Sequence, residues 1–172
     1  MLDLQNLPTA VKHEQTFALI GFRCDEGIRR NLGRTGAAEG PHAIRHALAR
    51  LPVQKQNFIC YDAGDIICTD GNLEASQQAL GKAIALLLNQ GMTPIALGGG
   101  HEIAWGHYQG IDQTHPTKHL GIINFDAHFD MRPLLPDNKG SSGTPFLQIA
   151  EAHHASNRRI DYNCIGIQHA GN

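Results

Sequence analysis

The sequence predicts an α/β protein in which helices cover both faces of a mainly parallel sheet. Short apolar runs recur along its 172 residues and alternate with segments of helical periodicity. A strand, a helix and another strand in succession predict parallel pairing, because parallel strands need a long, usually helical, crossover. The chain length fits one domain, and 41% hydrophobic residues can supply its core. We therefore expect one domain over residues 1–172.

Five apolar runs are predicted to be buried strands, because each is short and lies between polar or helical segments. In chain order they are 17–22 (FALIGF), 58–61 (FICY), 93–97 (TPIAL), 119–125 (HLGIINF) and 162–167 (YNCIGI).

Three segments have the features of helices. Leucine and isoleucine recur at helical spacing over 73–88, between Asn72 as a candidate N-cap and Gly91 as a candidate C-terminal residue. A second helix is expected over 41–51, where one proline favours the start and another ends the segment. A third is expected over 144–155.

Composition favours small-molecule chemistry over binding to large polyanions. A net charge of -2 and a pI of about 6.6 provide no basic stripe for nucleic acid or an anionic membrane. No apolar window approaches the length of a membrane span, and the N-terminus lacks the basic start and apolar run of a signal peptide. Four cysteines without CxxC pairs fit a reducing compartment, so we expect a cytoplasmic protein.

The segment after the fourth predicted strand carries Asp126, His128 and Asp130 at alternate positions. In extended backbone these side chains share one face and can converge on one centre or a close pair. Carboxylate and imidazole ligands without thiolates suit Mn²⁺, Zn²⁺ or Fe²⁺. The alternative is that the acids cap the next helix and the histidine is polar lining.

A second polar exit, GGGHE at 98–102, follows the third predicted strand. It lacks the Lys-Ser or Lys-Thr of a phosphate loop and the spacing of a dinucleotide loop, although a simple turn stays possible. In a parallel sheet, ligands bind beyond the carboxyl ends of the strands, so the two exits can place His101 beside Asp126 and Asp130, with His128 across from it. This is the layout of a two-metal centre.

GGGHE, NFDAHFD (124–130) and SSGTPF (141–146) resemble the ureohydrolase family, and the likeness spans most of the chain. The resemblance implies a three-layer α/β/α sandwich and hydrolysis of amidine or guanidine C–N bonds with two Mn²⁺ ions. It further implies that His101 and Asp130 bind one ion, His128 binds the other and Asp126 bridges them. Homo-oligomers are common in this family.

Within the family, Ser142 stands where arginases and agmatinases usually carry a histidine. SSGTPF, DAHFDMRP and CDEGIRRNLGRTGA look most like the members that cleave N-formimidoyl-L-glutamate to L-glutamate and formamide through a hydroxide bridging the two ions. The alternatives are an agmatinase or another guanidine hydrolase that releases urea, and a truncated, inactive homologue that acts as a binding module.

The family's last two metal ligands are aspartates of an S-x-D-x-D-x-x-D-P motif, which this sequence does not contain. The resemblance therefore predicts a domain that is incomplete at its C-terminus, with half of the ligand sphere and little or no turnover on its own.

Candidate roles beyond metal binding follow from the chemistry of the expected reaction. Asp130 and Ser142 are the candidate catalytic residues, since a carboxylate can return a proton to the leaving nitrogen and a hydroxyl can bind the substrate. Thr144 is a further substrate-binding candidate, unless it and Ser142 only form a turn. Arginine best clamps the carboxylates of a glutamate-like substrate. The candidates, each of which has an ordinary solvated role as its alternative, are Arg132, Arg34 and Arg30.

Overall fold

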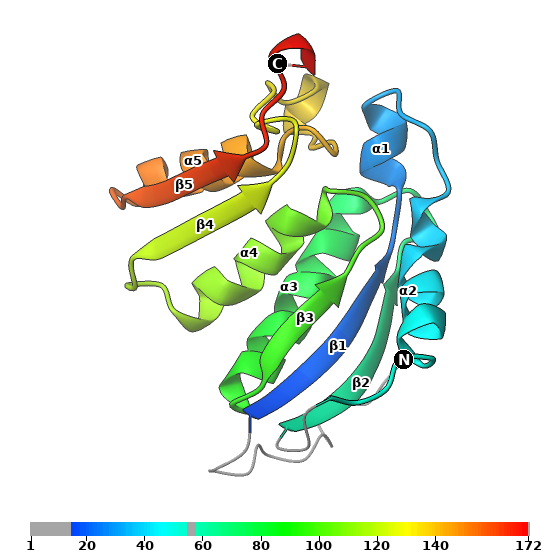
Figure 1. The fold of residues 1–172 in the computed structure, drawn as a ribbon. Helices are drawn as coiled ribbons and strands as arrows, with labels where there is room; N and C mark the ends of the chain where they lie inside the picture. The colour runs from blue at the N-terminus through cyan, green and yellow to red at the C-terminus, as the bar shows by residue number, and fades with distance from the viewer. Residues whose placement is uncertain (1–14, 55–57, 172) are drawn as a thin grey trace.

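The computed structural model describes residues 15–54 and 58–171 (Figure 1). Its strands are β1 (Gln15–Arg23), β2 (Phe58–Ile67), β3 (Thr93–Leu97), β4 (Leu120–Phe125) and β5 (Ile160–Ile165). Its α-helices are α1 (Glu26–Arg30), α2 (Gly40–Leu48), α3 (Leu73–Asn89), α4 (Ile103–Thr114) and α5 (Pro145–Ala155). Short 3₁₀ turns lie at Ala37–Glu39, Pro136–Asn138 and His169–Gly171.

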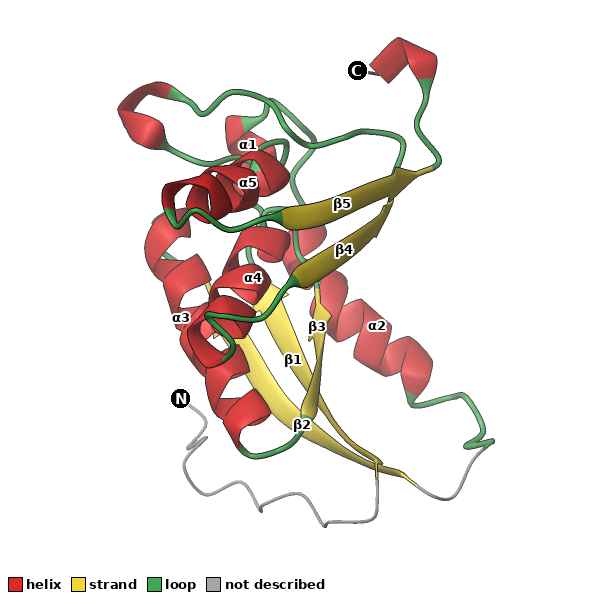
Figure 2. Ribbon diagram, turned by 90° about the vertical axis from the view of Figure 1, so that its left-hand side faces the viewer, coloured by secondary structure: helices red, strands yellow, loops and turns green. Residues whose placement is uncertain are grey.

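All the strand pairs of the described residues are parallel, as predicted, but they form two sheets. One sheet has the order β2-β1-β3 and the other consists of β4 and β5. Helix α2 lies on one side of the first sheet, and α3 and α4 lie on the other (Figure 2). The predicted α/β sandwich is thus confirmed, with the difference that β3 and β4 do not pair with each other.

The predicted elements all appear, with ends shifted by a few residues, and two helices appear that were not predicted. The side chain of Asn72 caps α3 by accepting from the backbone N–H of Ala75 at 3.1 Å. Gly91 follows this helix with φ 78°, a left-handed conformation that glycine adopts without steric cost. The helices that were not predicted are α1, which has only five residues, and α4.

Helix α4 was missed because its glycines weaken the helical pattern, yet these glycines let it pack closely on α3. A Cβ added at Gly110 would lie 2.6 Å from the carbonyl oxygen of Gly81 and 2.5 Å from Cβ of Ile84. At Gly106 it would lie 2.9 Å from the carbonyl oxygen of Gln77. The two helix backbones are therefore nearly in contact, and glycine is required by this approach although it disfavours helix by about 1 kcal/mol relative to alanine.

The main core lies between the first sheet and α3. Alternate side chains of β1 point to this core, as expected for a strand with one face against a helix. The fully buried side chains of β1 and α3 include Ala18, Ile20, Phe22, Leu73, Leu80, Ile84 and Leu87. A second cluster joins α4 and α5 to the other sheet through Tyr108, Phe146 and Ile149. Within the described ranges, no helix combines the length and apolar character needed to cross a membrane.

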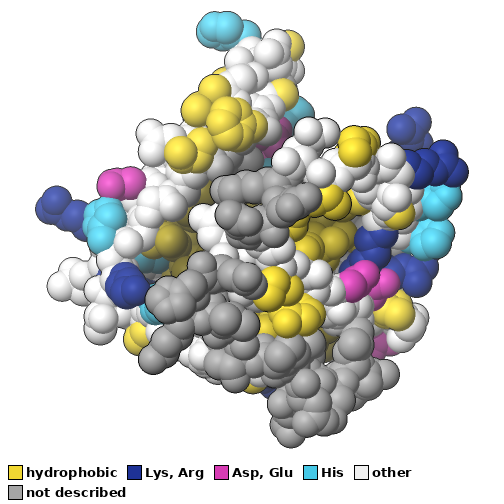
Figure 3. Space-filling view, turned by 60° about the horizontal axis from the view of Figure 1, so that its bottom comes forward, with side chains coloured by type: hydrophobic (Ala, Val, Ile, Leu, Met, Phe, Trp, Pro, Cys, Tyr) yellow, Lys and Arg dark blue, Asp and Glu magenta, His cyan; other side chains and the backbone are white. Residues whose placement is uncertain are grey.

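Each sheet leaves one edge open toward the other. Among the described residues β3 pairs only with β1, and β4 pairs only with β5. Apolar side chains are exposed on these strands, with Ile95 42%, Ile123 65% and Phe125 79% accessible. Figure 3, which brings the bottom of the molecule forward, shows hydrophobic side chains between flanks that carry Lys, Arg and His. Open strand edges with exposed apolar side chains are features that folded proteins normally cover.

Substituting Gly110 with alanine tests the contact between α3 and α4. We expect Gly110→Ala to lower the free energy of unfolding by about 1–3 kcal/mol, because the added methyl group meets backbone that cannot move aside. The matched control is Gly121→Ala in β4, where an added Cβ meets nothing within 4 Å. Urea titration of both variants gives the comparison, and an equal or higher stability for Gly110→Ala would contradict the packing argument.

Candidate metal centre

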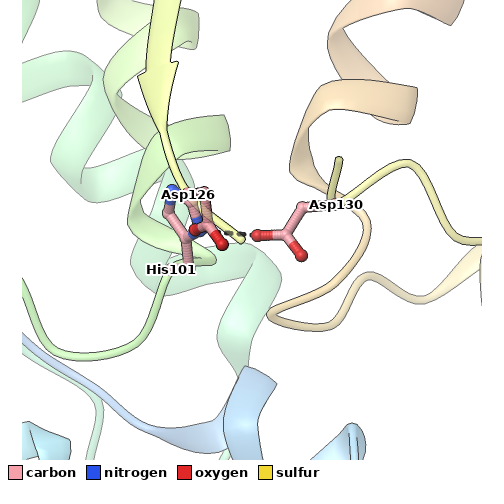
Figure 4. Close-up of side chains that lie close together, drawn as sticks. All are labelled: His101, Asp126 and Asp130. Atoms are coloured by element: carbon pink, nitrogen blue, oxygen red, sulfur yellow. Dashed lines mark ion pairs between the residues drawn. The ribbon is translucent and has the colours of Figure 1, made fainter. Parts of the chain in front are cut away.

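Three side chains from the ends of β3 and β4 meet at one point (Figure 4). Nδ1 of His101 lies 2.6 Å from Oδ2 of Asp130 and 3.2 Å from Oδ2 of Asp126. One ligand atom from each of the three residues lies within 4.8 Å of the others. This convergence agrees with the prediction that the carboxyl ends of parallel strands place these residues together.

The three glycines before His101 let its loop lie against the end of β1. The backbone N–H of Gly99 donates to the carbonyl of Phe22 at 2.9 Å, and that of Gly100 donates to the carbonyl of Cys24 at 2.9 Å. A Cβ at Gly99 would lie only 2.0 Å from the carbonyl oxygen of Cys24. The glycines thus serve a close approach of backbone to backbone.

Strand β5 holds the segment that carries the two aspartates. The N–H of Asp126 donates to the carbonyl of Ile165 at 3.0 Å and continues the β4–β5 pairing. The hydroxyl of Tyr162 donates to the carbonyl of Phe129 at 2.9 Å. Asp130 follows with φ 47°, a left-handed conformation unusual for a residue with a side chain. The backbone after β4 is therefore fixed by its neighbour in a turn that returns Asp130 toward Asp126.

His128 lies on the far side of Asp126. Its Nδ1 is 3.3 Å from Oδ1 of Asp126, while Oδ2 of the same carboxylate faces His101. The two oxygens of Asp126 are thus turned toward two different histidines, but His128 is not part of the group of three whose ligand atoms converge. The side chain of His128 is 48% exposed, so it stands at the surface of the centre.

Burial and neighbouring charges change the pKa values of His101 and Glu102. The hydrogen bond with Asp130 raises the pKa of His101 above its usual value, although burial opposes this shift. Burial raises the pKa of Glu102 to about 6. The Nδ1 atom of His101 and Oδ2 of Asp130 therefore face each other at 2.6 Å.

The donor atoms fit a divalent manganese ion. One imidazole nitrogen and two carboxylate oxygens form a mixed N/O set, which suits Mn²⁺ and related ions. The set lacks the thiolates that are typical of structural zinc sites. Within the described residues this is the one group of three or more His, Cys, Asp or Glu close enough to hold an ion.

The predicted Ser142 and Thr144 lie in one turn but in different environments. Ser142 is partly exposed, and its backbone N–H donates to the carbonyl of Gly27 at 3.0 Å. Thr144 is 1% exposed, and its hydroxyl is within hydrogen-bond distance of the backbone of Ser141 and the side chain of Gln148. These contacts favour the turn-forming alternative for Thr144, whereas Ser142 stays a candidate for contact with substrate.

The three predicted arginines are placed differently. Arg132 is exposed and donates from Nη1 to Oδ1 of Asn31 at 3.2 Å, with its backbone N–H on the carbonyl of Gly143. Arg34 is exposed. Arg30 is 11% exposed, and its guanidinium binds the carboxylates of Glu74 and Glu26 at 2.5 and 3.1 Å. The side chain of Arg30 therefore connects α1 to α3, a structural role that differs from both the predicted substrate contact and the solvated alternative.

Sequence reasoning missed several residues that support the centre. Tyr162 and Cys164 occupy alternate positions of β5 and both contact the loop after β4, with Sγ of Cys164 3.2 Å from the carbonyl oxygen of His128. The alternation of Tyr162 and Cys164 predicts that both lie on one face of the strand, but nothing in the sequence indicates which segment that face contacts. Glu102, which follows His101 directly, is completely buried.

The sequence model of the Arginase family matches residues 15–172. The chain therefore belongs to the arginase family. The predicted ureohydrolase resemblance is thereby confirmed.

Its relatives include formimidoylglutamases. The chain is 52% identical over 174 residues to one from Geobacillus thermodenitrificans and 51% identical over 175 residues to one from Geobacillus kaustophilus. Each alignment covers 100% of this chain and 52% of the relative. Among solved structures, Trypanosoma cruzi formiminoglutamase with Mn²⁺₂ matches with a TM-score of 0.76 and 33% identity, over 94% of this chain and 58% of that one. The chain spans about half the length of the curated relatives that it matches.

Removing the hydroxyl of Tyr162 tests the support that β5 gives to the centre. The pKa of Tyr162 is raised by burial, so the hydroxyl stays protonated and donates at neutral pH. We expect Tyr162→Phe to lower the free energy of unfolding by about 1–2 kcal/mol, because the carbonyl of Phe129 loses its donor. Tyr61→Phe on β2 is the matched control. If urea titration shows that Tyr162→Phe lowers the free energy of unfolding no more than the control does, this bond does not stabilise the loop.

Proposed function

We propose that the full-length protein hydrolyses N-formimidoyl-L-glutamate to L-glutamate and formamide. The observation that carries the proposal is the convergence of His101, Asp126 and Asp130 in a chain about half identical to formimidoylglutamases over its whole length. Ser142, in place of the histidine usual in arginases and agmatinases, favours this substrate over a guanidine that would release urea.

The proposed cofactor is a pair of Mn²⁺ ions. His101, Asp126, His128 and Asp130 would hold the ions, with Asp126 shared between them. The orientation of Asp126, with one oxygen toward each histidine, supports this assignment. The family resemblance implies two further aspartate ligands in a motif that this sequence does not contain, and the alignment covers 52% of the relative.

The chain's own residues would orient the substrate and move protons. When bound, two divalent cations supply Lewis acidity and make water nucleophilic near neutral pH. Water adds to the formimidoyl carbon, and the bond from that carbon to the glutamate nitrogen breaks. Asp130, whose side chain is 13% exposed, takes one proton from water and delivers it to the leaving nitrogen. The other proton of water goes to the formimidoyl =NH nitrogen, which becomes the amide NH₂ of formamide. Ser142 hydrogen-bonds the substrate beside it.

Arg132 is the candidate for binding a carboxylate of the substrate. It follows Asp130 by two residues, and its guanidinium is exposed with one contact to the side chain of Asn31. Its backbone is fixed by Gly143, next to Ser142. A guanidinium in this position can pair with a carboxylate while the formimidoyl group lies at the metal centre.

The experiment that tests the function identifies the products. The expressed full-length protein, with its length verified by intact mass, is incubated with N-formimidoyl-L-glutamate and separately with agmatine and arginine. We expect formamide and glutamate from the first substrate and no urea from the others. Removing metal with a chelator should abolish turnover, and Mn²⁺ should restore it. Urea as the main product would identify a guanidine hydrolase, and no turnover of any substrate would support the binding-module alternative.

Replacing Arg132 tests the substrate-binding assignment. We expect Arg132→Ala to raise KM about 10–100-fold while kcat changes little, because a charge-assisted hydrogen bond to the substrate is lost in both ground and transition states. The control is Arg50→Ala at the exposed end of α2, which removes the same charge elsewhere. Steady-state kinetics on both variants decide the question, and an unchanged KM would exclude Arg132 from the pocket.

A further inference from the structure

The completely buried carboxylate of Glu102 connects the His101 loop to α1. Glu102 is 0% exposed, and its Oε1 accepts from the backbone N–H of Gly27 at 2.9 Å. The side-chain amide of Gln77 on α3 donates to the carbonyl of Glu102 at 2.8 Å. A Cβ at Gly27 would lie 2.5 Å from Cδ of Glu102, so α1 lies directly against this side chain. The other oxygen, Oε2, is buried with no hydrogen-bond partner in the described residues, so the bond from Gly27 is what offsets the costly desolvation of this carboxylate.

Further backbone hydrogen bonds connect Gly27 to the segment that carries Asp130. The carbonyl of Gly27 accepts from the N–H of Ser142 at 3.0 Å. In the same turn, the carbonyl of Gly143 accepts from the N–H of Arg132 at 2.9 Å. The N–H of Phe146, which begins the next helix, donates to the carbonyl of Asp130 at 3.2 Å. A chain of hydrogen bonds therefore runs from the loop after β3 to the segment after β4.

We infer that Glu102 is a positioning residue, whose hydrogen bond to Gly27 fixes the Ser142 turn and the Asp130 segment relative to His101. The effect on metal binding rests on the proposed function. The hydrogen bond from Gly27 to Glu102, called the tether below, is a property of the metal-free protein. The two sheets share no strand pair in the described residues, so contacts of this kind must set the distance between their exits. The oxygen of the side chain, and not its charge, is what the tether requires.

Two substitutions separate the hydrogen bond from the charge. Glu102→Gln keeps an oxygen acceptor for Gly27 and removes the charge, whereas Glu102→Ala removes both. Leu80→Ala is the control for loss of buried volume, because Leu80 is also 0% exposed but belongs to α3, where its side chain lies in the main core. All three are made in the full-length protein.

The first readout is amide hydrogen exchange of the metal-free protein by NMR. We expect Glu102→Ala to speed exchange of the Gly27 and Ser142 amides at least tenfold, and Glu102→Gln to stay near wild type. Leu80→Ala should speed amide exchange within α3 more than exchange of the Gly27 and Ser142 amides. Unchanged exchange at Ser142 in Glu102→Ala, or equal loss in Glu102→Gln, would overturn the inference.

The second readout is Mn²⁺ affinity, measured from the electron paramagnetic resonance signal of the free ion. Glu102→Ala should bind Mn²⁺ roughly 10–100-fold more weakly than wild type, as is typical for groups that orient a metal ligand, and Glu102→Gln should recover most of the affinity. An affinity of Glu102→Ala equal to wild type would contradict the positioning role. A wild-type protein that binds no Mn²⁺ would refute the proposed cofactor, while the exchange data would still decide whether Glu102 is a tether.

Discussion

The close approach of α3 and α4 is the constraint on which the arrangement of the two sheets depends. Helix α4 begins directly after the loop that carries His101, and its other side contacts α5 through Tyr108 and His153. Because Gly81 and Gly110 leave no space for a methyl group, the axis of α4 is fixed against α3 and hence against the first sheet. The second sheet is built on α4 and α5, so its position follows from the same contact.

The metal centre depends on this arrangement because its ligands come from both sheets. His101 leaves β3, whereas Asp126 and Asp130 leave β4, and β4 shares no hydrogen-bonded pair with β3 in the described residues. The ring of His101 also packs edge-on against Phe146 at 5.6 Å, which in turn stacks on Tyr162 at 4.5 Å. A series of aromatic contacts thus supports the histidine from the same strand that holds the aspartate loop. Ligand geometry within a fraction of an ångström requires such support, because each side chain alone has several rotamers.

Much of the fold and the convergence of His101, Asp126 and Asp130 could be predicted because the signals were local. The apolar runs gave the strands, and Asn72 and Gly91 marked the ends of α3. The predicted alternation of Asp126, His128 and Asp130 on extended backbone was wrong, because the motif follows the end of β4 and a turn with φ 47° at Asp130 brings that side chain toward Asp126. What failed depended on contacts distant in sequence. Glycines that weaken α4 as an isolated helix are favourable only against α3, and the division into two sheets is a matter of pairing, which apolar runs do not specify. Thr144 was similarly ambiguous, since only its burial distinguishes a turn hydroxyl from one that meets substrate.

Charge gives a physical reason for the greater length of the relatives. Two Mn²⁺ ions bring four positive charges, whereas the cluster of described residues offers two carboxylates, Asp126 and Asp130, and the imidazole of His101. Partly buried charge must be neutralised or remain costly, so the proposed pair of ions needs further anionic ligands. The open edges of β3 and β4 flank the exits that carry the centre, and a cavity of about 240 Å³ beside His101 is lined by Ile122, Ile123 and other apolar side chains. A segment that paired with either open edge would bury apolar surface next to the loops that carry His101 and Asp126.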